Sequence, residues 1–364
     1  MDAQERRRKK TLWTKGRGEN LSRKHLDKNK KQDLELIMRE LSPEIEEKLA
    51  RIESMVGNTP LLKLDFVFHN KPVSIFAKYE AVNFSGSIKD RMAIKILRHA
   101  YTTGILNPGD LIVEATSGNT GIAFSAMGAF LDHPVKIYMP EWMSEERKAL
   151  MRLYGAEVVE VTQEQGGFLG SMEMAAADAE KEGVFCPSQF SNWQNVEAHR
   201  ETTGPEIAKA FADLGLRPDA FVAGAGTGGT IMGVSSILKM ENINLKSHPV
   251  FPLNHEENGG THRIEGIGDS FVPKILKLNA LHSEIRVDDE DAIVVAQMLN
   301  QKGLSAGISS GANVWAALSI ASKGGKNVAT VLCDSAMKYL TTDLCKPAKK
   351  AMDDLKFVGF DRVD

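Results

Sequence analysis

The feature that most constrains the fold is a repeated unit in which a short apolar strand runs into a loop of small residues and then into a helix. One unit has its strand at 111–115 and its loop at 116–121, and another has its strand at 219–223 and its loop at 224–230. A further strand and helix pair begins at Val135. Strands that alternate with helices predict parallel sheets with helices on both faces, and therefore an open, twisted α/β fold.

Composition limits the class of protein. The chain has 364 residues, of which 42% are hydrophobic and 26% charged, which suffices for one large or two medium domains. The net charge of -3 implies no general attraction to nucleic acid or an anionic membrane, and no apolar run reaches transmembrane length. The three cysteines, Cys186, Cys333 and Cys345, lack metal-ligand spacing and fit a reducing compartment. We therefore expect a cytoplasmic protein without a metal.

Residues 1–43 differ from the rest of the chain. The run from Arg6 to Lys10 opens a segment that is rich in charge and poor in apolar side chains, which predicts a basic, disordered tail. A helical pattern begins near Asp33. A solvated tail and a tail that binds acidic partners both fit this composition.

One lysine stands just inside a predicted helix start. A strand-like run at 73–78 precedes it, and Ser87 followed three residues later by Asp90 is a capping signal. Lys89 then lies in the first turn, where the positive end of the helix dipole disfavours an ammonium. A neutral amine is what Schiff-base chemistry requires. An ordinary surface lysine on an amphipathic helix fits the same pattern.

The two loops of small residues are candidate anion sites, because each lies between a strand and a helix N terminus. Loop 116–121 can bind a carboxylate through hydroxyls and backbone N–H groups, although a well-capped βα turn has the same sequence character. In the second loop, Gly224, Gly226 and Gly229 satisfy the G-x-G-x-x-G dinucleotide fingerprint. The acidic residue that this fingerprint requires is not well placed, and the same loop can hold a single phosphate.

The stretch 83–91, Asn-Phe-Ser-Gly-Ser-Ile-Lys-Asp-Arg, resembles the Schiff-base motif of the cysteine synthase and cystathionine β-synthase family of pyridoxal phosphate enzymes. Phe84 stands where proline is usual. Residues 57–61 are similar to the family's Gly-Asn-Thr-Pro-Leu motif, and loop 116–121 to its substrate-carboxylate loop. The resemblance covers about residues 52–340 and implies fold type II, the tryptophan-synthase-β-like fold.

This resemblance implies two domains and a homodimer. A larger domain, formed by 48–90 and 195–350, would bind the cofactor. A smaller domain at 91–194 would carry the substrate loop and move when substrate binds.

The resemblance also implies a role for each candidate site residue. Lys89 would hold pyridoxal 5'-phosphate as an imine and act as the catalytic base, Asn119 would meet the phenolic oxygen, and Ser309 the pyridine nitrogen. A hydroxyl does not keep that nitrogen protonated, which favours β-elimination through an aminoacrylate. The phosphate would bind at Gly226, Thr227, Gly228, Gly229 and Thr230. The substrate would bind at Thr116, Ser117, Gly118, Thr120, Gln189 and Gly266.

Three segments depart from the family pattern. Asp269 follows a Gly-Ile-Gly run where cysteine synthases usually carry Ala-Gly-Phe, and a carboxylate there can activate water as a second catalytic residue. An exposed loop aspartate explains the residue as well. Residues 248–257 lack the usual Glu-Pro, and residues 336–340, Ala-Met-Lys-Tyr-Leu, replace the usual Gly-Glu-Arg-Tyr-Leu.

The predicted reaction is that of a cysteine synthase, in which O-acetylserine and sulfide give cysteine and acetate. The alternatives are a cysteine lyase that releases hydrogen sulfide, a cystathionine β-synthase-type condensation, a catalytically silent cofactor-binding regulator, and a nicotinamide-dependent dehydrogenase. The expected partners are an amino acid (O-acetylserine, serine or cysteine) and sulfide or a thiol, with neither membrane nor nucleic acid.

Overall fold

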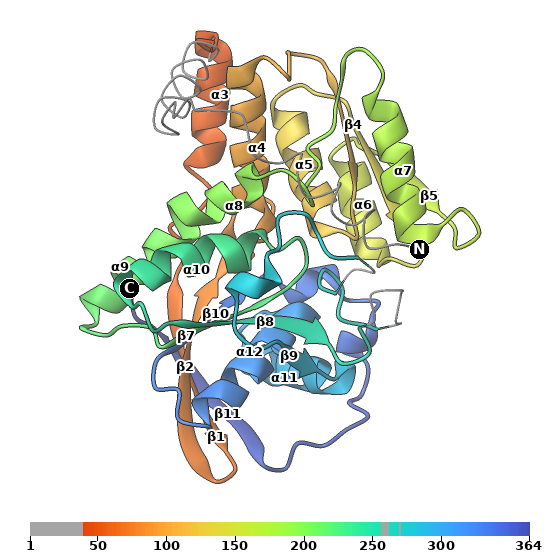
Figure 1. Ribbon diagram of the computed structural model, residues 1–364. Coiled ribbons are helices and arrows are strands. Elements are labelled where there is room, and N and C mark those ends of the chain that lie inside the picture. The colour runs from red at the N-terminus through yellow and green to blue at the C-terminus, as the bar shows by residue number, and fades with distance from the viewer. Residues whose placement is uncertain (1–38, 256–261, 269–270) are drawn as a thin grey trace, which may run out of the picture. The chain divides into compact units, whose positions relative to one another are not determined.

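Two β-sheets with helices packed on them form the unit from Leu41 to Asp364 (Figure 1). The computed structural model describes residues 39–255, 262–268 and 271–364. The helical pattern expected near Asp33 and most of the basic tail lie outside these residues.

The larger sheet has seven strands in the order β11-β1-β2-β10-β7-β8-β9. Pairs from β2 through β10, β7 and β8 to β9 are parallel, as the strand and helix alternation predicts. The edge formed by β11, β1 and β2 is antiparallel. The strands are β1 (Leu61–Phe68), β2 (Lys71–Tyr79), β7 (Ala220–Gly224), β8 (Lys246–Pro252), β9 (Ile285–Val287), β10 (Val328–Leu332) and β11 (Leu355–Arg362).

The antiparallel edge departs from the expected all-parallel sheet for a local reason. Only His69 and Asn70 separate β1 from β2, and both have positive φ, 49° and 59°. Two central residues with positive φ form the tight turn whose twist matches an antiparallel hairpin, so the chain returns beside the strand it has just left.

The smaller sheet has four parallel strands in the order β5-β4-β3-β6. They are β3 (Leu111–Ala115), β4 (Val135–Pro140), β5 (Glu157–Val161) and β6 (Val184–Phe185). The helices of the unit are α3 (Pro43–Glu53), α4 (Lys89–Thr103), α5 (Asn119–Phe130), α6 (Glu145–Leu153), α7 (Gly167–Ala179), α8 (Gln194–Ala198), α9 (Gly204–Asp213), α10 (Gly229–Glu241), α11 (Asp289–Gln301) and α12 (Ile308–Ala321).

Successive side chains along the strands of the larger sheet pack in two different clusters, so the core around this sheet has two layers. Ile75 and Ala77 of β2 pack in a cluster with α11 and α12, whereas Phe76 between them packs in a cluster with α9 and α10. Successive side chains of a strand point to opposite faces, so the sheet is covered on both sides (Figure 1). In the smaller sheet, α4 and α5 share a cluster with β3 and β4, and Ala175 of α7 packs in another.

Helix α4 begins at Lys89, and its N-cap residue is Ile88 rather than the expected Ser87. The first turn is closed by i to i+3 bonds, from the Asp90 N–H to the Ser87 carbonyl at 3.2 Å and from the Arg91 N–H to the Ile88 carbonyl at 3.3 Å, while Ser87 also forms an isolated β-bridge with Asp334. The expected Ser87 and Asp90 interaction is nevertheless present, because the Asp90 carboxylate accepts from the Ser87 N–H at 3.3 Å and the Lys89 N–H donates to Ser87 Oγ at 3.3 Å. Lys89 therefore lies in the first turn, as predicted.

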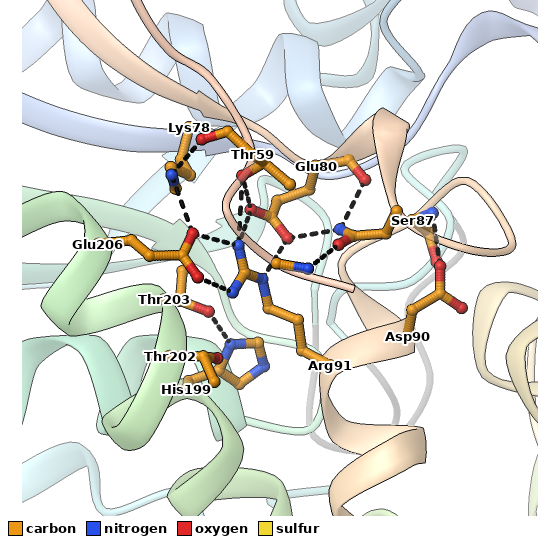
Figure 2. A network of polar contacts seen from close by, with 12 residues as sticks. Thr59, Lys78, Glu80, Ser87, Asp90, Arg91, His199, Thr202, Thr203 and Glu206 are labelled. Carbon is orange, nitrogen blue, oxygen red and sulfur yellow. Dashed lines mark hydrogen bonds and ion pairs between the residues drawn. The ribbon is translucent and has the colours of Figure 1, made fainter. Parts of the chain in front are cut away.

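A buried ionic network behind Lys89 joins α4 to the larger sheet (Figure 2). The Arg91 guanidinium donates to both carboxylate oxygens of Glu80, at 2.6 and 2.8 Å, and to both of Glu206, at 2.7 and 2.8 Å. Lys78 Nζ lies 3.0 Å from Glu206 Oε2, and Thr59 donates to Glu80 at 2.7 Å. Bidentate arginine and carboxylate pairs fix orientation as well as distance, so this network sets where α4 starts.

The network predicts a loss of stability in acid. Burial alone would raise the pKa of Glu206, but the hydrogen bond and charge of Arg91 and the charge of Lys78 lower it from 4.5 to about 2. Because the folded-state pKa is depressed, the stabilisation is present above about pH 4.5 and is lost as the pH falls toward about 2. We expect Glu206→Gln to lower the free energy of unfolding at neutral pH by about 3 kcal/mol and to flatten its acid dependence, measured by urea denaturation.

The matched control is Glu47→Gln, because Glu47 pairs with Arg51 on the exposed face of α3. This variant should change the free energy of unfolding by less than about 1 kcal/mol. Equal losses in the two variants would contradict the role given to the buried network.

Candidate active site

One pocket collects most of the residues singled out in the sequence. It lies where the N termini of α4 and α5 meet the loop after β7. Its lining consists of Lys89, Thr116, Ser117, Asn119, Thr120, Arg147, Gln189, Phe190, Thr227 and Gly266. Gly118 lies within the loop 116–120. Of the other predicted residues that the structure describes, Gly226, Gly228, Gly229, Thr230 and Ser309 are not part of this lining.

The loop after β3 is held in shape by its own side chains. Thr116 Oγ1 accepts from the Gly118 N–H at 3.0 Å, and Thr120 Oγ1 donates to Gln189 Oε1 at 2.6 Å. The Gln189 side-chain amide donates in turn to the Ala115 carbonyl at 2.8 Å. Because α5 begins at Asn119, the unpaired N–H groups of its first turn add to the hydroxyls of this loop. The arrangement suits a carboxylate.

A buried carboxylate supports this loop from behind. Glu114 Oε2 accepts from the Gln189 backbone N–H at 3.1 Å, and Glu114 Oε1 accepts from the Ala115 N–H at 3.0 Å. Burial raises the pKa of Glu114 to about 7, although these N–H groups favour the ionised form. Glu114 thus joins the loop at 116–120 to the Gln189 segment.

The glycine-rich loop forms a cradle of bare backbone at the N terminus of α10. A Cβ added to Gly226 would clash with the carbonyl of Gly266, and one added to Gly229 would clash with Asn195. Gly228 has a φ of 90°, which favours glycine. Thr227 Oγ1 accepts from Asn195 Nδ2 at 3.0 Å. Backbone N–H groups at a helix start bind phosphate, and this loop is therefore suitable for the phosphate of pyridoxal phosphate.

Thr230 and Ser309 have defined partners near this cradle. Thr230 Oγ1 lies 3.2 Å from His199 Nε2, and His199 is buried in a π-helical turn (His199–Thr203). Ser309 lies buried in the first turn of α12 and hydrogen-bonds to Cys333. Burial raises the pKa of the Cys333 thiol to about 12, opposed by the positive charge of Lys89.

Arg147 also lines the pocket, although no motif in the sequence marks it as a site residue. Arg147 comes from α6, donates to the Ser117 carbonyl at 3.3 Å and forms an ion pair with Glu265. Its guanidinium lies 4.6 Å from the centre of the Tyr339 ring. These contacts join segments that are far apart in the sequence, so no local pattern could have revealed them.

Aromatic rings pack beside the pocket-lining Phe190. Its ring centre lies 5.7 Å from that of Phe168 and 4.9 Å from that of Phe271. Asp269, the second predicted catalytic residue, lies outside the described residues. Gly268, just before it, donates its N–H to the Ala225 carbonyl at 3.0 Å, so this segment adjoins the glycine-rich loop.

The described part of the chain contains neither a bilayer-spanning helix nor a metal site. No helix there is long and apolar enough to span a bilayer. Among the same residues, no cluster of histidine, cysteine, aspartate or glutamate has the arrangement of a metal site.

Comparison with known proteins agrees with the geometry of the pocket. The family model described as pyridoxal-phosphate dependent enzyme matches residues 52–334. Cysteine synthase B from Campylobacter jejuni is 41% identical over 81% of this chain and 98% of its own length, and a cysteine synthase from Staphylococcus aureus is 38% identical over 80% and 96%.

Solved structures extend the agreement to the fold. A hydrogen sulfide-producing enzyme from Fusobacterium nucleatum superimposes with a TM-score of 0.83 and is 47% identical, covering 87% of this chain and 100% of that one. These matches confirm the expected fold and cofactor and remove the dinucleotide interpretation of Gly224, Gly226 and Gly229. The chain belongs to the pyridoxal-phosphate dependent enzymes, within the group that includes the cysteine synthases and the hydrogen sulfide-producing enzymes.

Proposed function

We propose that this enzyme releases hydrogen sulfide from cysteine, with water or a thiol taking the place of the departing sulfide. The family relationship establishes the underlying chemistry, which is β-elimination or β-replacement on a β-substituted amino acid. The observation that carries the direction is the 47% identity over the full length of the hydrogen sulfide-producing enzyme. The cysteine synthase relatives are less similar, at 38–41%.

In this proposal the cofactor is held by residues from both sheets. Lys89 binds it covalently, the cradle at 226–230 takes its phosphate, Asn119 meets its phenolic oxygen, and Ser309 its ring nitrogen. Pyridoxal phosphate, when bound, supplies an electron sink for the carbanion that forms at the substrate's Cα. The narrowness of the cradle, where a Cβ on Gly226 or Gly229 would clash, supports this placement of the phosphate.

The substrate is bound by the smaller sheet's loop. Thr116, Ser117, Gly118 and Thr120 hold its carboxylate, with Gln189 beside Thr120. Gly266 borders the position of the β-substituent across the pocket. Lys89 Nζ removes the proton from the substrate Cα, as a general base within the same pocket. We propose that residues 91–194 move toward 48–90 and 195–350 when this carboxylate binds.

We propose that Asp269 activates the water that completes cysteine hydrolysis. The overall reaction consumes cysteine and water and yields serine and hydrogen sulfide. Gly268, the last described residue before Asp269, donates its N–H to the Ala225 carbonyl at 3.0 Å, so the chain adjoins the glycine-rich loop just before Asp269, which supports this role. An aspartate-to-asparagine variant of the hydrogen sulfide-producing enzyme has been crystallised with an α-aminoacrylate intermediate, which supports a late role for an aspartate.

Cysteine synthesis from O-acetylserine and sulfide is the second candidate, because the curated relatives are named cysteine synthases. A cystathionine-type condensation uses the same pocket with a larger thiol. We further propose that the protein is a cytoplasmic homodimer. A silent regulatory role is the least supported alternative, since the lysine and the phosphate cradle are both intact.

Two measurements on the purified protein distinguish sulfide release from cysteine synthesis: its absorption spectrum and a parallel sulfide assay. We expect visible absorption from the lysine-bound cofactor, and brisk sulfide release with serine formation when cysteine is added. A strong spectral change with O-acetylserine that sulfide reverses, together with little sulfide release from cysteine, would assign the enzyme to cysteine synthesis. Absence of visible absorption would contradict the proposal.

Replacing Asp269 by asparagine tests whether its carboxylate takes part in the hydrolysis. We expect Asp269→Asn to lower kcat for hydrolytic sulfide release by about a hundredfold, because general-base catalysis is lost, while cofactor absorption is kept. Asp213→Asn, on the exposed face of α9, is the control and should retain full activity. Full hydrolytic activity in Asp269→Asn would remove the proposed role.

A further inference from the structure

The side-chain amide of Asn119 lies between two opposite charges. Lys338 Nζ donates to Asn119 Oδ1 at 2.9 Å, and Asn119 Nδ2 donates to Asp334 Oδ2 at 2.7 Å. An ammonium can only donate hydrogen bonds and an ionised carboxylate can only accept them. The two neighbours therefore define which end of the amide carries oxygen and which carries nitrogen.

Both charged neighbours are themselves held in place. Lys338 is 5% exposed, and its Nζ also donates to the Gly86 carbonyl, at 3.1 Å, within the Schiff-base stretch. Its own carbonyl accepts from Ser144 Oγ at 3.0 Å, at the start of α6. Asp334 Oδ2 accepts a further hydrogen bond from the Tyr339 hydroxyl at 2.9 Å. Neither charge can leave the amide without breaking these contacts.

The arrangement has a consequence for the pocket, which Asn119 lines. The amide nitrogen carries two hydrogens, and Asp334 takes one of them. The second N–H remains for a group in the pocket. If the amide rotated by half a turn, its oxygen would face the Asp334 carboxylate and its nitrogen the Lys338 ammonium, and both contacts would become repulsive.

We propose that Lys338 is a positioning residue that fixes the amide of Asn119 with an N–H directed at the phenolic oxygen of the cofactor. This inference rests on the proposed function, which places that oxygen at Asn119. It gives a role to a residue that stands where the family pattern has arginine. The positive charge of Lys338 also polarises the amide, which strengthens its N–H as a donor.

The pKa of Lys338 depends on its burial and on the charged groups around it. Burial lowers its pKa most, the carboxylates of Asp334 and Asp90 raise it, and the positive charges of Arg147 and Lys89 lower it, to about 8. Above about pH 8 the amine becomes neutral and its hydrogen bond to Asn119 weakens. We therefore expect the cofactor spectrum to change through this pH range in the parent enzyme.

The test compares three variants as holoenzymes. Lys338→Met removes both donor and charge, Lys338→Gln keeps a neutral donor, and Lys338→Arg keeps donor and charge. Loss of a charged hydrogen bond predicts cofactor binding about tenfold weaker in Lys338→Met, with absorption moved from the visible toward the near ultraviolet. Lys338→Arg should stay close to the parent and Lys338→Gln should lie between. Lys148→Met, which removes a buried ammonium paired with Glu160, should leave the spectrum unchanged.

A double-mutant cycle with Asn119→Ala separates positioning from general damage. If Lys338 acts through Asn119, adding Lys338→Met to Asn119→Ala should produce no further spectral change. An equal change in both backgrounds, or a parent-like spectrum in Lys338→Met, would overturn the proposal. Crystals of Lys338→Met without cofactor give an independent readout: a rotated or disordered Asn119 side chain supports the proposal and an unchanged one overturns it. Failure of the parent to bind the cofactor would instead reject the proposed function.

Discussion

The position of Lys89 depends on the paired interactions of Arg91 with Glu80 and Glu206. Arg91 lies in the same helix turn as Lys89, and both of its carboxylate partners come from elements of the larger sheet's layer. All three charged groups lose water on burial, and their paired hydrogen bonds, together with those from Lys78 and Thr59, compensate for that loss. In our proposal Lys89 binds the cofactor, which requires a helix start that does not shift, and the network around Arg91 holds that helix start (Figure 2).

The two sides of the pocket are supported in different ways. The phosphate cradle depends on backbone packing, since a side chain at Gly226 or Gly229 would clash with its neighbours. The substrate loop depends on hydrogen bonds that Glu114 and Thr120 make to the Gln189 segment. In our proposal, the backbone packing keeps the cofactor phosphate in place, whereas the hydrogen bonds between polar side chains rearrange when the substrate carboxylate binds.

Two of the departures from the family pattern belong to segments that contact the predicted site. Lys338 contacts Asn119 directly, and Asp269 follows a segment that is bonded to the glycine-rich loop. In our proposal, the residues that match the family bind the phosphate and the substrate carboxylate, whereas Lys338 and Asp269 act on the cofactor's partner Asn119 and on the attacking water.

The sequence by itself determined the local features: alternating strands and helices, a lysine in a first helical turn, and small-residue loops at strand ends. These follow from capping, side-chain periodicity and turn preferences, which act over a few residues. Only the tertiary structure decided that Lys338 meets Asn119, 219 residues away, that Arg91 meets Glu206, 115 residues away, and that β11 closes the sheet edge. Such contacts depend on how whole elements pack, and no pattern within a short stretch carries that information.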